Sequence, residues 1–169
     1  SINSNKSDAN LMMQRLIYHK WYLGGNLEGS SNSELGYKFR ILGGVSIINY
    51  IVQNYHNRLY LSLGSNANRE WSMDTDEVTN NLEGLFGINY HYYKYTDPEF
   101  NITTYLKTYP NFTTPGRYRV NYYLDAKIEV ISDFNVGINF YYNFDSKPIS
   151  EDASREDYGI ATTISYTFH

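Results

Sequence analysis

The sequence predicts an all-β fold, an antiparallel up-and-down transmembrane β-barrel. Three observations support this prediction. Apolar and polar residues alternate with period 2 along most of the chain, charged residues keep mainly to one alternating register, and aromatic residues gather near the ends of the alternating segments. Charged residues make up only 19% of the chain, so much of its polarity comes from Asn, Tyr, Ser, Thr and Gly. A soluble domain this polar usually carries more charge, about a quarter of its residues.

Length and composition set further limits. The 169 residues suit one domain, which we place at 1–169. The chain has no cysteine, which excludes disulfides and thiolate metal sites, and a net charge of −4 gives no reason to expect a nucleic-acid partner. No apolar run approaches the roughly 20 residues of a membrane helix.

The segment 118–130 shows the alternation most clearly. Its even positions carry Tyr, Val, Tyr, Leu, Ala, Ile and Val, whereas its odd positions carry Arg, Asn, Tyr, Asp, Lys and Glu. A helix would scatter these classes around its axis, but a strand separates them onto two faces. The segments 135–144 and 158–168 repeat the pattern. These three segments are therefore predicted to be strands.

Along the whole chain we predict about nine antiparallel strands joined as a meander. Turn signals such as Ser30–Ser33, Asp74–Asp76, Thr96–Pro98 and Thr114–Gly116 separate them. The predicted ranges are 9–18, which is the weakest, then 20–29, 36–49, 57–71, 77–93, 99–109, 118–130, 135–144 and 158–168. No helix, linker or second domain is predicted.

Alternation alone does not distinguish a soluble barrel from a membrane barrel. In the eight clearer strands, the apolar register as we assign it contains no Asp, Glu, Lys or Arg, and a lipid-facing Arg or Lys costs about 2–4 kcal/mol. This depletion favours lipid over a protein core. The residues predicted to face lipid include Leu61, Leu63, Ile88, Leu124, Ile128, Ile138 and Ile164.

Aromatic residues on the apolar face are expected at the membrane–water interface, because Tyr and Trp have one apolar and one polar end. The predicted interface set is Trp21, Trp71, Tyr118, Tyr158, Tyr166 and Phe168. We place Tyr37, Tyr90, Tyr92, Tyr142 and Phe144 on the same face.

The opposite register is predicted to line the lumen with charges that pair across neighbouring strands. This predicted network comprises Glu83, His91, Lys107, Arg119, Asp125, Lys127 and Glu129. A His91–carboxylate pair would also suit a barrel hydrolase or acyltransferase, but no serine elbow or metal-ligand spacing accompanies it. We therefore predict no catalytic residue, no metal site and no cofactor, and the chain is not expected to be an enzyme.

Several short motifs resemble a known family when they are taken in order. They are Lys20-Trp21-Tyr22, Leu35-Gly36-Tyr37-Lys38-Phe39-Arg40, Arg117-Tyr118-Arg119, Tyr142-Asn143-Phe144-Asp145-Ser146-Lys147-Pro148 and Ser165-Tyr166-Thr167-Phe168. From about residue 9 to 168 the chain resembles the salt-induced outer-membrane protein family, a Gram-negative β-barrel family of unknown function. The resemblance implies a location in the bacterial outer membrane and supplies no activity or catalytic residue.

The predicted strand count is odd, whereas bacterial single-chain barrels have even counts and both termini in the periplasm. An odd count puts the two ends of the meander on opposite sides of the membrane. We therefore expect a barrel that lacks N-terminal strands, with 10 or 12 strands when complete. An eight-stranded barrel in which 9–18 does not span is the alternative. In the first case the nine strands do not close, and 9–18 presents an unpaired edge.

The function expected from these observations is that of an integral outer-membrane barrel with a structural or accessory role. Such a barrel could be a subunit of an envelope complex or a small porin-like pore. The alternatives are a barrel enzyme that uses His91 and a soluble ligand-binding β-barrel. Expected partners are outer-membrane lipids, other envelope proteins, and the barrel-assembly machinery, which would read the C-terminal strand with Tyr166 and Phe168.

Overall fold

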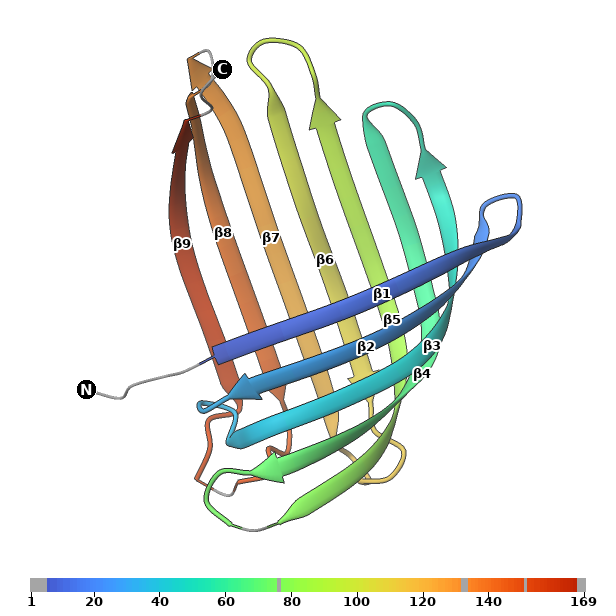
Figure 1. Cartoon of the computed structure of the whole chain (residues 1–169), viewed down its shortest axis with the longest axis vertical. Coiled ribbons are helices and arrows are strands. Elements are labelled where there is room, and N and C mark those ends of the chain that lie inside the picture. The colour runs from blue at the N-terminus through green and yellow to red at the C-terminus, as the bar shows by residue number, and fades with distance from the viewer. Residues whose placement is uncertain (1–5, 76, 132–133, 151, 167–169) are drawn as a thin grey trace.

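The chain folds into a single antiparallel sheet of nine strands in sequential order (Figure 1). The computed structural model describes residues 6–75, 77–131, 134–150 and 152–166. The strands are β1 (Lys6–Tyr18), β2 (Trp21–Asn32), β3 (Tyr37–Gln53), β4 (Asn57–Ser72), β5 (Val78–Lys94), β6 (Phe100–Pro110), β7 (Tyr118–Ile131), β8 (Phe134–Asp145) and β9 (Glu156–Tyr166). The predicted all-β, up-and-down architecture is confirmed. The described segments include no helix with the length and hydropathy needed to cross a membrane.

The sheet is rolled, so that β1 to β4 cross in front of β5 to β9 at a steep angle (Figure 1). Connections between strands alternate between its two ends. The residues 33–36, 73–77, 111–117 and 146–155 connect strands at one end, which we call the loop end. The connections at the other end, which we call the turn end, are shorter on average and include 19–20, 54–56 and 95–99.

The sheet does not close on itself, as the odd strand count predicted. Within the described residues, β1 pairs with β2 and β9 pairs with β8, but β1 and β9 share no ladder. At the loop end, the Lys6 ammonium of β1 lies 3.7 Å from the Asp157 carboxylate of β9. From that point the two strands diverge (Figure 1). The fold is therefore barrel-like, with an open gap between its first and last strands.

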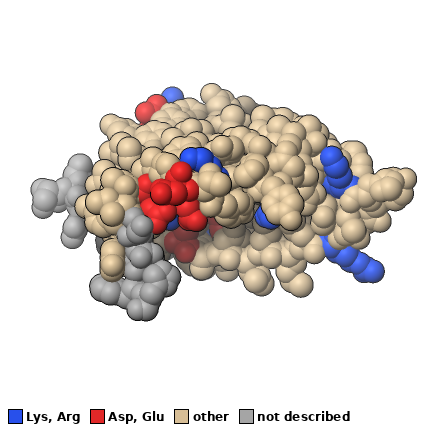
Figure 2. Space-filling model, turned by 90° about the horizontal axis from the view of Figure 1, so that it is seen from above, with Lys and Arg blue, Asp and Glu red and all other residues tan. Residues whose placement is uncertain are grey.

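The two faces of the sheet have opposite character. The concave face carries buried polar side chains, and Glu70 and Glu83 have no exposed surface. The other face exposes large apolar side chains, such as Leu63 at 67% and Ile164 at 72%. Figure 2, which looks along the long axis, shows a surface largely free of Lys, Arg, Asp and Glu, with charges gathered in a few places. The burial is thus inverted relative to a soluble barrel, whose apolar residues point inward.

The structure corrects the predicted faces in two places. Arg69 pairs with Ile41 in the outer register, so that register is not free of charge. Its guanidinium lies 5.2 Å from the centre of the Trp71 ring near the loop end. Tyr37 was predicted on the apolar face, but it is 5% exposed and stacks on Arg40 on the inner side. A bulge between Tyr37 and Phe39 adds one residue to β3 and reverses the alternation there.

Close backbone approach on the concave face explains one glycine. A Cβ on Gly64 would lie 2.2 Å from the carbonyl oxygen of Val45, a backbone atom that cannot move aside alone. A Cβ on Gly25, in the outer register of β2, would meet only the Gly44 carbonyl oxygen, at 4.0 Å. The tight curvature of β3 and β4 therefore requires glycine at position 64 and does not require it at position 25.

We expect Gly64→Ala to lower the free energy of unfolding by about 1–3 kcal/mol, the usual cost of forcing extra volume into a packed site. Urea titration in detergent micelles, followed by tryptophan fluorescence, measures this loss. The matched substitution Gly25→Ala should change stability by less than about 1 kcal/mol, because the added methyl group meets open space. Equal losses for the two variants would show that close approach is not the reason for Gly64.

Candidate functional site: a charged lumen

Four buried charged residues occupy the concave side of the loop end. An Arg40 Nη2 lies 2.6 Å from Glu70 Oε1, and an Arg117 Nη2 lies 2.9 Å from Glu70 Oε2. Arg117 also donates hydrogen bonds from Nε and Nη2 to the Asp145 carboxylate at 3.0 and 2.6 Å. All four side chains are less than 5% exposed. Two carboxylates and two guanidiniums thus form a balanced cluster from β3, β4, β8 and the 111–117 loop.

A second buried pair lies one step deeper in the lumen. Arg119 donates from Nε to Glu83 Oε1 at 2.9 Å, and its Nη2 bonds to the other carboxylate oxygen, a two-pronged geometry. The Tyr109 ring lies 4.8 Å from the Arg119 guanidinium carbon. Because β6 separates β5 from β7, this pair reaches over an intervening strand. The contacts among Glu83, Tyr109 and Arg119 therefore link β5, β6 and β7 on the concave face.

The charge state of Arg117 follows from its neighbours. Burial alone acts to lower the pKa of its guanidinium, but hydrogen bonds to Asp145 and the nearby Glu70 carboxylate outweigh burial and raise the pKa. The guanidinium is therefore held in its protonated form, and its charge is matched by the Asp145 and Glu70 carboxylates.

The long 146–155 loop reaches across to the β2–β3 turn. The Ser150 hydroxyl donates to the Gly36 carbonyl at 2.8 Å and lies 3.0 Å from the Ser72 hydroxyl. Gly36 has a φ of +74°, and a Cβ there would lie 2.6 Å from the Ala153 side chain. Leu35 and Tyr37 are buried beneath this contact. The connection between β8 and β9 thus packs against the β2–β3 turn at this end of the lumen.

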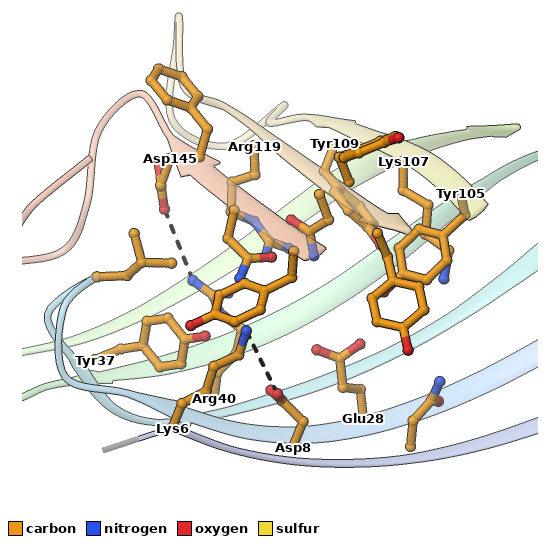
Figure 3. A pocket seen from close by; sticks show the side chains of 18 residues that line it. Lys6, Asp8, Glu28, Tyr37, Arg40, Tyr105, Lys107, Tyr109, Arg119 and Asp145 are labelled. Carbon is orange, nitrogen blue, oxygen red and sulfur yellow. Dashed lines mark ion pairs between the residues drawn. The ribbon is translucent and has the colours of Figure 1, made fainter. Parts of the chain in front are cut away.

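A cavity of about 550 Å³ lies on the concave side next to the ion cluster. In Figure 3, Glu28 points into it from β2, and Lys107 and the Tyr105 and Tyr109 rings lie on the facing wall, in β6. The cavity continues toward a smaller one that Glu28, Lys107 and Asn66 help to line. This space lies in the ordinary size range of small-molecule sites, about 300–1,000 Å³.

The structure places the predicted lumen residues as follows. Glu83 and Arg119 form the buried pair described above. Asp125 and Lys127 approach to 3.3 Å, but both belong to β7, and the lysine side chain is half exposed. The Lys107 ammonium lies 4.6 Å from the centre of the Tyr105 ring. Glu129 is partly exposed near the turn end. Of the predicted residues, only Glu83 and Arg119 belong to the buried part of the network.

His91 lies between aromatic rings. Its ring is parallel to that of Tyr93 at 6.3 Å and stacks on Tyr60 at 6.0 Å, and its Nδ1 lies 3.3 Å from the Thr103 hydroxyl. Glu83 is eight residues away on the same strand, about 26 Å along an extended chain. The fold therefore does not bring His91 next to Glu83, a lumen carboxylate of its own strand.

Sequence reasoning left Arg40, Glu70, Arg117 and Asp145 out of the predicted network, although these residues form its most connected part. Two signals pointed to them. Arg40 and Glu70 are opposite charges in directly paired positions of β3 and β4. Arg117 and Asp145 both lie next to turn signals, at strand ends that an antiparallel meander brings to the same side. The sequence pattern did not reveal how the sheet rolls up and brings β3 and β4 close to β7 and β8.

The predicted interface aromatics lie near the strand ends. Trp21, Tyr118, Tyr158 and Tyr166 are exposed, and Trp71 is partly exposed. Phe168 lies outside the described residues. Among the residues that the structure covers, no group of three His, Cys, Asp or Glu side chains could hold a metal ion.

These features define a class of protein, a barrel-like antiparallel sheet with an apolar outer face and a charge-paired lumen. The chain belongs to the family described as "Protein of unknown function, DUF481", which it matches over residues 2–168. Comparisons with curated proteins and with solved structures find no match.

Proposed function

We propose that this protein is an integral β-barrel of the bacterial outer membrane with a structural or accessory role. The observation that carries the proposal is the inverted burial: Glu70 and Glu83 are fully buried on the concave face, whereas Leu63 and Ile164 stay exposed on the other. Water penalises an exposed apolar wall, and hydrocarbon does not. The strands, 11 to 17 residues long, also suffice to cross the hydrocarbon layer, for which a tilted strand needs about 9–11.

The family supports the same proposal. The chain matches the DUF481 family over nearly its whole length, and its ordered motifs resemble the salt-induced outer-membrane protein family. This resemblance supports our proposal that the protein lies in a Gram-negative outer membrane. Short connections are typical of the periplasmic side and long loops of the outside. In this orientation the ion cluster and the contact between Ser150 and Gly36 lie at the outward-facing end, which favours an accessory role over that of an open pore.

The gap between β1 and β9 requires a covering partner in this proposal. Apolar side chains of β1, Leu11 and Met13 among them, are exposed beside unpaired backbone groups of the edge strand. An unsatisfied backbone group in hydrocarbon costs several kcal/mol. We propose that further strands, from the same protein or from another envelope protein, complete the wall between β1 and β9.

Tryptophan fluorescence tests the proposed membrane orientation. Trp21 and Trp71 are the only tryptophans, and they lie on the outer face near opposite ends of the strands. We expect phospholipid vesicles with brominated acyl chains to quench both. Bromine near the headgroups should quench more strongly than bromine near the chain ends, because both rings lie at the interface. The variant Trp21→Phe leaves only the Trp71 fluorescence, and Trp71→Phe leaves only that of Trp21, so each ring is measured separately.

Extraction and gel mobility provide the control. The folded protein should require detergent to stay in solution and should migrate differently on a gel before and after boiling. A protein that stays soluble without detergent, with neither tryptophan quenched by brominated lipid, would contradict the proposal and favour a soluble ligand-binding barrel.

A further inference from the structure

Tyrosines form a row across the inner wall. Directly paired positions on successive strands carry aromatic side chains, with one asparagine in the series. Running from β3 to β8, the row is Tyr50, Tyr60, Asn89, Tyr105, Tyr123 and Tyr141. All of these residues belong to the concave register. Because barrel strands tilt by about 35–45°, a row of directly paired residues follows a spiral along the lumen and not a flat ring.

Ring contacts join neighbouring members of the row. The centres of Tyr50 and Tyr60 are 5.0 Å apart, and those of Tyr105 and Tyr123 are 5.3 Å apart with nearly parallel planes. At the far end, Tyr141 lies over Gly159, where a Cβ would come within 2.5 Å of the ring. Three of the rings, Tyr105, Tyr123 and Tyr141, line the 550 Å³ cavity. The inner wall thus offers aromatic rings on both sides of Asn89, and three of them face the larger cavity.

Polar groups beside this surface have few partners in the protein. Among the described residues, neither Glu28 nor Lys107 forms an ion pair within 4 Å, and the Lys107 ammonium lies 4.6 Å from the centre of the Tyr105 ring. Asn66 is 1% exposed, yet neither its amide nitrogen nor its amide oxygen has a hydrogen-bond partner. All three side chains line the smaller cavity, and Glu28 and Lys107 also line the larger one. Buried amide groups normally form hydrogen bonds. The two unpartnered atoms of Asn66 therefore indicate that a ligand supplies the missing partners.

We propose that this lumen binds a neutral oligosaccharide along the tyrosine row. A pyranose ring has an apolar C–H face that packs on an aromatic ring, and a rim of hydroxyl groups that both donate and accept hydrogen bonds. Glu28 can accept hydrogen bonds, Lys107 can donate them, and Asn66 can do both. This set of groups matches the hydroxyl rim of a sugar. The other charged side chains that line the larger cavity are already in ion pairs, Lys6 with Asp8, Arg40 with Asp145 and Arg119 with Glu83. The remaining Glu28 and Lys107 contribute one negative and one positive charge, so the site favours a neutral sugar over an anionic one.

This inference goes beyond the proposed function but rests on its orientation, since it requires the tyrosine row to face an aqueous lumen. The proposed membrane barrel and the proposed sugar site can be refuted independently of each other. Gel mobility and brominated-lipid quenching report the barrel, whereas sugar binding reports the site.

The test titrates the full, folded protein in detergent with maltotriose, chitotriose and the anionic trisaccharide trigalacturonate, using calorimetry. We expect saturable binding of a neutral trisaccharide and weaker binding of trigalacturonate. Tyr123→Ala should weaken binding about tenfold, because one stacking contact is lost. Tyr123→Phe should retain binding within about threefold, because the ring remains.

Tyr158→Ala is the control, since Tyr158 is a tyrosine of the outer face on β9, is 67% exposed and lines neither cavity. It should leave the sugar affinity unchanged. Heat-modifiable gel mobility shows that each variant is folded. If Tyr123→Ala does not fold, Lys107→Met provides the second test and should also weaken binding. No saturable binding of either neutral trisaccharide, stronger binding of trigalacturonate, or equal losses in Tyr158→Ala and Tyr123→Ala would overturn the proposal.

Discussion

Glu70→Ala is expected to lower the free energy of unfolding by about 3–5 kcal/mol, the usual cost of removing one partner from a buried ionic cluster. Glu70 neutralises Arg40 at 2.6 Å and Arg117 at 2.9 Å, and all three side chains are buried. Without it, two guanidiniums share the single Asp145 carboxylate in a site that excludes water. Urea titration in detergent micelles measures the loss, and the temperature at which the folded gel band disappears provides a second reading.

Asp125→Ala is the control for this prediction. Asp125 pairs with Lys127 at 3.3 Å, but the lysine side chain is 50% exposed, so water replaces the lost contact. Its removal should cost less than about 1 kcal/mol. Glu70→Gln keeps the shape and removes the charge, and it should fall between the two. An unfolding midpoint for Glu70→Ala equal to that of Asp125→Ala would show that the cluster does not stabilise the lumen.

Ile138→Arg is expected to prevent assembly of the folded barrel in the outer membrane. Ile138 lies near the middle of β8 on the outer face and is 47% exposed. An arginine facing lipid near the bilayer centre costs about 2–4 kcal/mol, a large part of the stability of a small barrel. The measurement is the amount of heat-modifiable protein in outer-membrane fractions of cells that express the variant.

The neighbouring residue provides the matched control. Asn139 points to the concave face, where its amide donates to the Tyr123 hydroxyl at 2.6 Å and where Asp125 is its directly paired residue on β7. Asn139→Arg adds the same charge on the same strand, but it can pair with that carboxylate. We expect this variant to assemble. Normal assembly of Ile138→Arg together with failure of Asn139→Arg would reverse the assignment of the two faces.

The sequence by itself determined the strands and most of their facing. Alternation with period 2 is a local property, because successive side chains of any strand point to opposite faces. It therefore located β7 and β8 within one residue of their observed bounds. The same parity assigned Leu63 and Ile164 to the exposed face and Glu83 and Arg119 to the inner one. The odd count also predicted that the sheet would not close.

Only the tertiary structure decided which inner side chains meet. Period 2 gives the face of a residue, but it gives neither the register between strands nor the strands that rolling brings across the lumen. Arg117 bonds to Glu70, 47 residues earlier in the chain, and the Glu83–Arg119 pair reaches over an intervening strand. Tyr37 turned inward because a bulge reversed the local parity, which no pattern of residue types around it revealed. Facing is set by neighbours in sequence, whereas pairing in the lumen is set by the curvature of the whole sheet.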